Sequence, residues 1–265
     1  MSDLRAAEGT ERRRLPVYAS GAVDVPYVIE AMGERLVRDT HWEAHSHPTH
    51  ELLWNEAGAS TAEVDSRVWT ITPTIGLWMP AGVVHTGSAQ AGTWMRAAQF
   101  GPKVVESISD EPVAVEVSTL LRLLLRRLVE PELGQRSRAL TQDLVIDLVR
   151  PSSHAVVLQV PRADVLAPIV EAVMDDPADP RGLQDWSREI GVSSKTLARA
   201  FERETAMGFS RWVLAVRVQH AVRLMSGGHA LEDIAYVLGY ATPSAFSAAF
   251  KRATGLTPSA FRAST

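Results

Sequence analysis

The feature that most restricts how this chain can fold is a helix–turn–helix pattern between Leu231 and Pro258. Apolar residues at helical spacing run up to Gly239, which predicts that the first helix ends there. Thr242 and Pro243 then give a strong helix-start pattern. A threonine hydroxyl can accept hydrogen bonds from the first turn, and proline loses none at the first helical position. We therefore expect a second helix after a tight turn.

A second copy of this pattern lies upstream. When Gly191 is aligned with Gly239, Leu197 and Phe201 fall on the two phenylalanines that anchor the downstream second helix. Between the copies, apolar residues recur at helical spacing over residues 210–225, which predicts one long connecting helix. A rigid connector would let two second helices enter successive turns of a DNA major groove, about 34 Å apart.

The two second helices have outer faces that the apolar anchors leave free. Short side chains on such a face allow a helix to enter a major groove, and cations there can meet phosphates. A helical hairpin in an ordinary core would show the same anchors, so the repetition is what favours DNA binding. Arg217, on the connector, is expected to contribute only weakly and without sequence preference. The outer faces carry Lys195, Thr196, Ala198 and Arg199 upstream, and Ser244, Ser247, Ala248 and Lys251 downstream.

Residues 183–261 resemble the tandem helix-turn-helix DNA-binding domain of the AraC/XylS family of transcriptional regulators. The resemblance rests on SxxTLxRxFxxE, which starts at Ser193, and on IAxxLGYxxxSxFxxAFKRxxGxTP, which runs from Ile234 to Pro258. Ala206 departs from the family pattern, which has Gly there, so this turn either bears a left-handed penalty or closes differently. In that family the second helix of each unit contacts bases, which implies base contacts by Lys195, Thr196, Arg199, Ser244, Ser247 and Lys251.

Charge is distributed unevenly along the chain. From Arg181 to the C-terminus there are 11 Lys and Arg against 6 Asp and Glu, whereas residues 1–161 carry 15 against 20. Clustered positive charge suits phosphate contact, although a solvated helical surface could show the same excess. The lack of cysteine excludes disulfides and thiolate metal sites. No long apolar run or leader is present, so we expect a cytoplasmic protein without membrane contact.

Changes in polarity and in the pattern of apolar residues divide the sequence into five segments. Residues 1–16 are polar and are expected to form an N-terminal tail, with an ordered regulatory arm as the alternative. Short β-rich runs over residues 17–102 predict an all-β sandwich or small barrel. Residues 103–150 are helical and 151–162 form a linker. Residues 163–265 form an all-α domain with the two helix–turn–helix units, so the fold class is an all-β barrel with following helices, then an all-α domain.

Histidines are concentrated in the β-rich segment. His45 and His47 would point to the same face of a strand, because side chains alternate, and Glu51 follows four residues later. The patterns HxHxxxE and PxGxxH resemble the two cupin motifs, which implies that residues 17–102 form a cupin-like sensor domain. The resemblance makes His45, His47, Glu51 and His85 the ligands of a divalent ion such as iron, manganese, zinc or nickel.

Several alternatives stay open for these residues. Thr74 and Ala89 stand where the cupin motifs usually have Gly and Asn. Sensor domains of AraC-type regulators are cupin-like and many lack the ligands, so the histidines could bind an organic effector or lie satisfied inside the barrel. The ion could also be purely structural, with a separate organic effector. His41 and His50 are expected at the rim or surface. The domain's tryptophans line an effector pocket or fill the core: Trp42, Trp54, Trp69, Trp78 and Trp94.

The helical segment 103–150 has an apolar stripe formed by Val117, Leu121, Leu124 and Leu128. Further leucines beside it widen the apolar face beyond what one core contact needs. We expect homodimerisation through this face, with packing against the barrel as the alternative.

Together these features predict a regulator that binds double-stranded promoter DNA and whose cupin domain senses a divalent metal or a small molecule. RNA polymerase would be a further partner if the protein activates transcription. The competing class is a metal-dependent cupin enzyme. A catalytic cupin has no use for two major-groove readers, so we expect no enzymatic activity.

Overall fold

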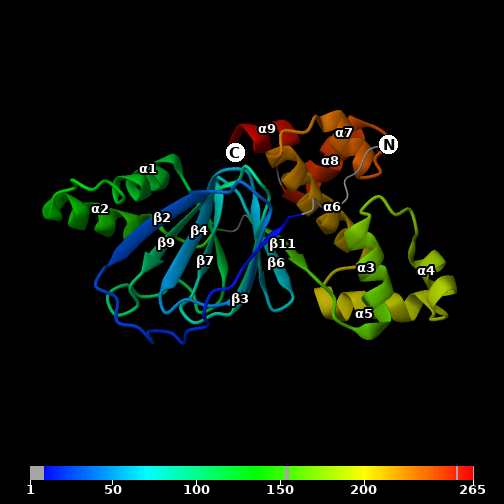
Figure 1. The fold of residues 1–265 in the computed structure, drawn as a ribbon. Helices are drawn as coiled ribbons and strands as arrows, with labels where there is room; N and C mark the ends of the chain where they lie inside the picture. The colour runs from blue at the N-terminus through cyan, green and yellow to red at the C-terminus, as the bar shows by residue number, and fades with distance from the viewer. Residues whose placement is uncertain (1–8, 153–154, 255, 265) are drawn as a thin grey trace. The chain divides into compact units, whose positions relative to one another are not determined.

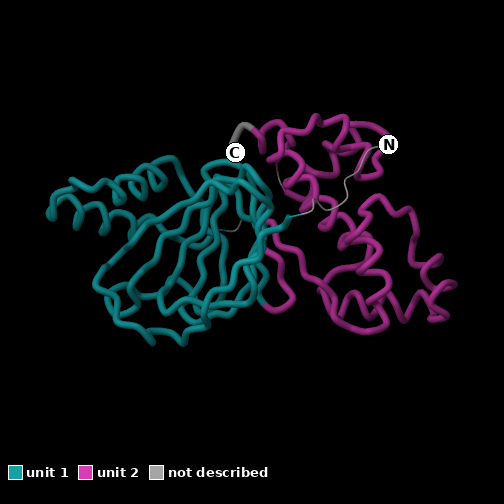
Figure 2. Tube along the Cα trace, viewed as in Figure 1, with its two compact units in different colours: residues 1–64, 70–155, 265 teal, residues 65–69, 156–264 magenta. Residues whose placement is uncertain are grey.

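The structure of this protein, a computed structural model, describes residues 9–152, 155–254 and 256–264 (Figure 1). The chain divides into two compact units (Figure 2). One unit contains the residues up to Val64 together with Thr70–Ala155, and the other contains Asp65–Trp69 together with Val156–Ser264. Among the described residues, no helix has both the length and the apolar character needed to cross a membrane.

Two sheets form the β-rich part of the structure. Within the described residues, one sheet has the strand order β1-β3-β8-β5-β6-β11 and the other has the order β10-β7-β4-β9-β2. The pairs that involve β4, β7, β8 and β9 are antiparallel. The strands are β1 (Glu11–Arg13), β2 (Ile29–Arg35), β3 (Thr40–His45), β4 (His50–Ala57), β5 (Ser60–Val64), β6 (Arg67–Ile71), β7 (Ile75–Met79), β8 (His85–Ala89), β9 (Trp94–Phe100), β10 (Val113–Glu116) and β11 (Val156–Gln159).

Two of these strands, β1 and β11, lie in segments that were expected to have no regular secondary structure. Strand β1 falls within residues 1–16, expected as a tail, and pairs in parallel with β3. Residues 1–8 of that segment lie outside the described residues. Strand β11 falls within residues 151–162, expected as a linker. In both places a short stretch of backbone finds hydrogen-bond partners in a neighbouring strand, which local sequence patterns do not reveal.

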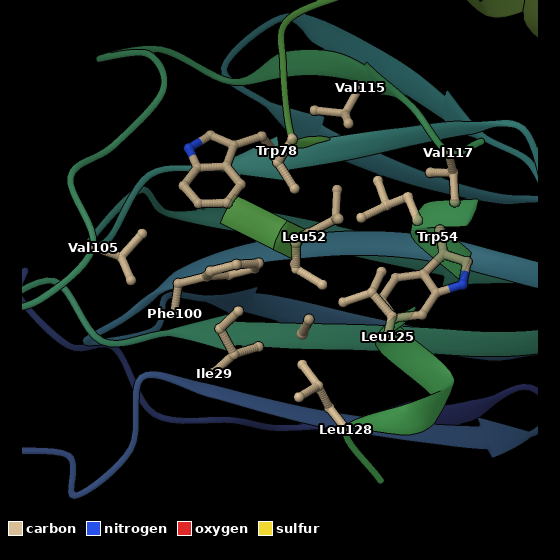
Figure 3. Packing of buried hydrophobic residues seen from close by; sticks show 14 residues of the cluster. Ile29, Leu52, Trp54, Trp78, Phe100, Val105, Val115, Val117, Leu125 and Leu128 are labelled. Carbon is tan, nitrogen blue, oxygen red and sulfur yellow. The ribbon is translucent and has the colours of Figure 1, made fainter. Parts of the chain in front are cut away.

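The hydrophobic core of the first unit lies on one face of the five-stranded sheet. Leu52 and Trp54 of β4 project into it, whereas Glu51, which precedes Leu52, lies on the opposite face because strand side chains alternate. Helices α1 (Thr119–Arg127) and α2 (Gln135–Leu148) cover this core. Figure 3 shows Leu125 and Leu128 beside the strands that carry the core aromatics. The helices therefore cover one face of the five-stranded sheet, and Glu51 lies on the other face.

The apolar stripe expected to pair two chains lies in this core. Val117, Leu121 and Leu128 are at most 5 % exposed, and Leu124 packs against the same cluster. These residues therefore cannot form a free dimer face, and the alternative expectation, packing against the barrel, describes them. On α1 and α2, the leucines that are exposed are Leu120, Leu123, Leu140 and Leu144, whereas Leu125 beside the stripe is buried.

The second unit is mainly helical. A short 3-10 helix and α3 are followed by the pair α4 and α5, by the 18-residue connector α6, and by the pair α7 and α8. The two pairs are the expected helix–turn–helix units, and α6 matches the expected connector. The helices are η1 (Asp164–Leu166), α3 (Ala167–Asp175), α4 (Leu183–Ile190), α5 (Ser194–Thr205), α6 (Phe209–Ser226), α7 (Leu231–Val237), α8 (Pro243–Thr254) and α9 (Pro258–Ser264).

The helix ends follow the local sequence patterns. Gly191 and Gly239 have φ values of 75° and 72°, the left-handed conformation that glycine adopts without a Cβ penalty. The hydroxyls of Ser193 and Thr242 accept backbone N–H groups in the first turns of α5 and α8, at 3.2 and 3.1 Å. Ala206 ends α5 with φ 54°, so this turn takes the left-handed conformation despite its side chain.

The second unit also includes residues 65–69, at the turn between β5 and β6. The N–H of Val160 donates to the carbonyl of Ser66 at 2.7 Å. The side chain of Gln159 donates to the Ser66 hydroxyl, and Val68 packs against the core that contains Trp186 and Phe201. This unit is therefore made from two separate stretches of the chain.

Candidate functional site

A cavity of about 520 Å³ lies between the two sheets of the first unit. It brings together three of the predicted ligands. His45 ends β3 and pairs in register with His85 at the start of β8, and His47 follows two residues after β3 ends. The ring centroids of His45 and His85 are 4.3 Å apart. One ring nitrogen from each of the three histidines lies within 4.8 Å of the others, a spacing that fits a shared metal ion.

Backbone carbonyls orient two of these rings. Nδ1 of His45 donates to the carbonyl of Glu43 at 2.7 Å, and Nδ1 of His85 donates to the carbonyl of Val83 at 3.0 Å. A carbonyl only accepts, so Nδ1 bears the hydrogen and Nε2 keeps its lone pair. Burial lowers the pKa of His45, His47 and His85, which favours the neutral, metal-binding form.

Glu51 is the fourth predicted ligand and lies opposite the histidines on β4. Its Oε1 accepts a hydrogen bond from Nε2 of Gln99 at 2.6 Å, and the Thr49 hydroxyl donates to the other end of the Gln99 amide. Its Oε2 is buried without a hydrogen-bond partner among the described residues. Nε2 of His47 lies 3.6 Å from Oε2, and Nε2 of His85 lies 3.8 Å from it. Burial raises the pKa of the Glu51 carboxyl.

This arrangement passes a test of fit for a divalent cation. A buried oxygen without a partner costs free energy, and a cation beside it would remove that cost. The other donors are imidazole nitrogens whose lone pairs are available. A set of imidazoles with one carboxylate suits first-row divalent metals. The residues that the sequence predicted as ligands could therefore hold such an ion.

His50 does not lie at the rim, and its expected position there was wrong. It is 8 % exposed, and its ring stacks on Trp78 with centroids 5.5 Å apart. Its Nδ1 accepts a hydrogen bond from the N–H of Ala81 at 3.0 Å, while the N–H of Gly82 donates to the carbonyl of His47 at 2.8 Å. These contacts hold the loop between β7 and β8, which leads to the ligand on β8.

The rest of the cavity is mostly apolar. Arg13 of β1 contributes to its wall, but its guanidinium makes two hydrogen bonds to the Glu34 carboxylate, at 2.5 and 2.8 Å, and lies over the ring of Trp42. The arginine charge is thus balanced within the protein. A largely apolar cavity with a few convergent polar groups is typical of small-molecule sites. Its apolar lining includes Leu15, Met32, Leu53, Ala62, Ile71, Met95 and Ala97.

Of the five tryptophans, three take one of the two expected roles, whereas Trp94 is half-buried with the guanidinium groups of Arg35 and Arg126 over its ring and Trp69 belongs to the second unit. Trp42 lines the cavity, whereas Trp54 and Trp78 are buried in the hydrophobic core. The sequence could not separate these roles because both need an apolar surrounding. His41 is half-buried, and its Nδ1 lies 2.9 Å from the Ser88 hydroxyl, outside the histidine cluster.

The predicted DNA-contacting residues lie on α5 and α8. On α5, Lys195, Thr196 and Arg199 are exposed, and on the opposite side Leu197 and Phe201 are fully buried. The Thr196 hydroxyl lies 2.8 Å from that of the capping serine. On α8, Ser244 and Lys251 are exposed and Ser247 is half-buried, while Phe246 and Phe250 are buried. Both helices thus have one buried and one accessible side.

Comparison with known proteins gives the class of this protein. Residues 27–149 match a family model described as an AraC-like ligand binding domain, and residues 186–264 match a helix-turn-helix domain model. A ligand-binding domain followed by a helix-turn-helix domain is the layout of a transcriptional regulator.

Named relatives agree with this class. The chain is 25 % identical over 218 residues to the HTH-type transcriptional regulator NimR of Escherichia coli, an alignment that covers 81 % of this chain and 80 % of NimR. It is 36 % identical over 93 residues to the HTH-type transcriptional regulator RipA of Corynebacterium glutamicum, covering 35 % of this chain and 28 % of RipA. The structure of ToxT from Vibrio cholerae aligns with a TM-score of 0.37 and 12 % identity over 89 % of this chain and 97 % of ToxT.

The chain belongs to the AraC family of transcriptional regulators. The relatives named here are transcriptional regulators. The resemblance to AraC-type regulators, the two-domain fold class and the regulatory function are thereby confirmed.

Proposed function

We propose that this regulator binds promoter DNA through α5 and α8, and that a divalent metal ion held by His45, His47, Glu51 and His85 controls this binding. The observation that carries the proposal is the buried Oε2 of Glu51, which faces imidazole nitrogens at 3.6 and 3.8 Å and has no other partner among the described residues.

The ligand set supports an ion that is held by separate strands. The ligands come from β3, β4 and β8 and from the turn after β3. When bound, the ion would supply a positive charge that compensates the Glu51 carboxylate and ties these strands together. Four protein ligands leave coordination positions for a small molecule on several first-row metals, and the adjoining cavity has room for one. Iron, manganese, zinc and nickel all suit this donor set.

The base-reading role is proposed for the exposed residues of the two second helices. Their faces combine short hydroxyl side chains with cations, which can hydrogen-bond base edges and phosphates. The buried anchors on the opposite sides fix the orientation of each helix. The residues proposed to contact DNA are Lys195, Thr196 and Arg199 on α5, and Ser244, Ser247 and Lys251 on α8.

Homodimerisation is proposed through a different set of leucines from the one that the sequence indicated. Leu120 and Leu123 of α1 are 51 % and 54 % exposed, and Leu140 and Leu144 of α2 are 60 % and 41 % exposed. Each pair is spaced three or four residues apart, so each forms a stripe on its helix. Exposed apolar stripes of this kind favour contact with a second copy of the chain, which would present two sets of reading helices to repeated DNA sites.

One experiment tests metal control directly. The protein is purified without a histidine tag, depleted with a chelator and reloaded with each metal, and its affinity is measured for DNA selected from a random pool. We expect one ion per chain and a 5- to 150-fold change in DNA affinity on loading, the usual range of coupling between sites. His47→Ala should abolish both effects. His41→Ala is the matched control, since its imidazole lies outside the cluster.

Two results would contradict the proposal in different ways. Full metal occupancy with unchanged DNA affinity would make the ion structural and leave a separate organic effector as the regulator. Failure of every tested metal to bind would leave the histidines as effector-binding or structural residues of the cavity.

A further inference from the structure

Arg217 lies near the middle of α6 and is half-buried. Its Nε donates a hydrogen bond to the carbonyl of Pro177 at 2.7 Å. Its guanidinium also lies over the ring of Tyr240, 5.3 Å from the centroid. The connector arginine is therefore engaged within the protein, through one hydrogen bond and one aromatic ring.

The two partners of Arg217 lie in loops beside the two helix–turn–helix pairs. Pro177 lies in the loop between α3 and α4, which leads into the upstream pair α4 and α5. Tyr240 directly follows Gly239, in the turn between α7 and α8 of the downstream pair. One planar guanidinium thus contacts both segments at once, through a hydrogen bond to one and a ring of the other, an arrangement that suits arginine better than lysine.

A backbone contact lies beside this arginine. Gly239 has φ 72°, and a Cβ on it would lie 3.1 Å from both Cα and Cβ of Ala178. The turn between α7 and α8 therefore rests directly against the loop between α3 and α4. Space and backbone conformation both require glycine there. Arg217 of α6 and the contact of Gly239 with Ala178 therefore both join the α3–α4 loop to the α7–α8 turn.

If α5 and α8 both contact DNA, the separation between them sets the number of base pairs between the two sequences that they contact. Adding one base pair between two recognised sequences moves one of them by about 3.4 Å and rotates it by about a tenth of a turn. A protein whose two reading helices are held rigidly accepts one such spacing. A protein whose units can shift about α6 accepts several.

We propose that Arg217 is a specificity-determining residue that fixes the distance and angle between the two reading helices, and therefore the number of base pairs between the two sequences they recognise. It acts by positioning and contacts no base. The inference rests on the proposed reading of DNA by both α5 and α8.

In vitro selection from a random DNA pool tests the inference, with wild type and Arg217→Ala treated in parallel. The wild type should recover two short sequences at one dominant spacing. The variant should recover the same two sequences at several spacings. In gel-shift titrations the wild type should prefer the parent site over sites with one base pair added or removed by at least about tenfold, a loss typical of one mismatched base pair. The variant should lose most of that preference.

A phosphate-contacting arginine predicts a different result. Its removal would weaken binding equally at every spacing and would reduce the salt dependence of binding by about one counterion. A variant that keeps one dominant spacing, with uniformly lower affinity, would therefore overturn the inference. Recovery of a single sequence by the wild type would overturn the reading by both helices and the inference with it.

A second pair of variants covers the case in which Arg217→Ala does not fold, as judged by thermal melting. Tyr240→Phe keeps the aromatic ring beneath the guanidinium and should keep the dominant spacing. Tyr240→Leu removes the ring and should broaden the spacing. Identical spacing profiles for these two variants would contradict a role for the arginine–ring contact.

Discussion

The hydrogen bond from Gln99 to Glu51 gives a quantitative test of the proposed metal centre. Gln99→Leu preserves much of the side-chain volume but removes the 2.6 Å bond to Oε1 of Glu51. A buried acceptor left without a donor costs about 1–3 kcal/mol of the free energy of unfolding, and more if it is charged. The carboxylate also loses the contact that holds its other oxygen toward the histidines. Loss of such an orienting partner typically weakens metal binding by about 10- to 100-fold.

Two measurements separate these effects. Urea unfolding of the metal-free protein gives the loss of stability, and competition with a chromogenic chelator gives the metal affinity. Thr49→Val is the matched control, because it removes only the hydroxyl that donates to Gln99 and leaves the bond to Glu51 in place. We expect its metal affinity to stay within a few-fold of wild type. A folded Gln99→Leu protein with wild-type metal affinity would refute the placement of Glu51 among the ligands.

Four further variants test other parts of the structure. Leu123→Glu combined with Leu144→Glu should give a folded monomer in sedimentation experiments, because both side chains are exposed and a charge at a symmetric interface is repeated on the second copy. By contrast, Leu121→Ala should lower the free energy of unfolding by about 2–5 kcal/mol, because Leu121 is fully buried. Arg199→Ala should weaken specific binding by about 1–3 kcal/mol, and an unchanged footprint would exclude α5 as a base reader. Ala206→Gly should raise the thermal midpoint, since φ is 54° and the left-handed penalty of alanine is about 1 kcal/mol.

Local patterns were enough to predict the helix–turn–helix units. A capping hydroxyl, a terminal glycine and apolar residues at helical spacing act within a few residues, so the sequence contains all the information they need. His45 ends β3 and His47 lies two residues beyond it, so the strand alternation expected of HxH does not extend to His47, and β8 brings His85 beside them by pairing with β3. The motif resemblance supplied what strand alternation alone could not, namely that His85 joins this group.

Contacts between distant parts of the chain were harder to predict. The role of Gln99 depends on the pairing of β4 with β9, which sets Gln99 opposite Glu51. The apolar stripe near Leu121 was broad enough to face either a partner chain or the barrel, and only the packed structure separates the buried leucines from the exposed ones. His50 resembled a surface residue because its partners, Trp78 and Ala81, lie on another strand and its loop.

The five residues from Asp65 to Trp69 limit how this protein can be divided or recombined. Ser66 and Val68 complete the unit that reads DNA, although the sequence places them in the middle of the sensor. A fragment that begins at Val156 would lack these partners and expose apolar surface that Val68 covers. Exchange of sensor domains between relatives would also have to preserve this turn. In this chain the boundary between the domains along the sequence therefore differs from the boundary between the folded units. A chimaera joined only at the linker would combine the β5–β6 hairpin of one protein with the DNA-binding unit of another.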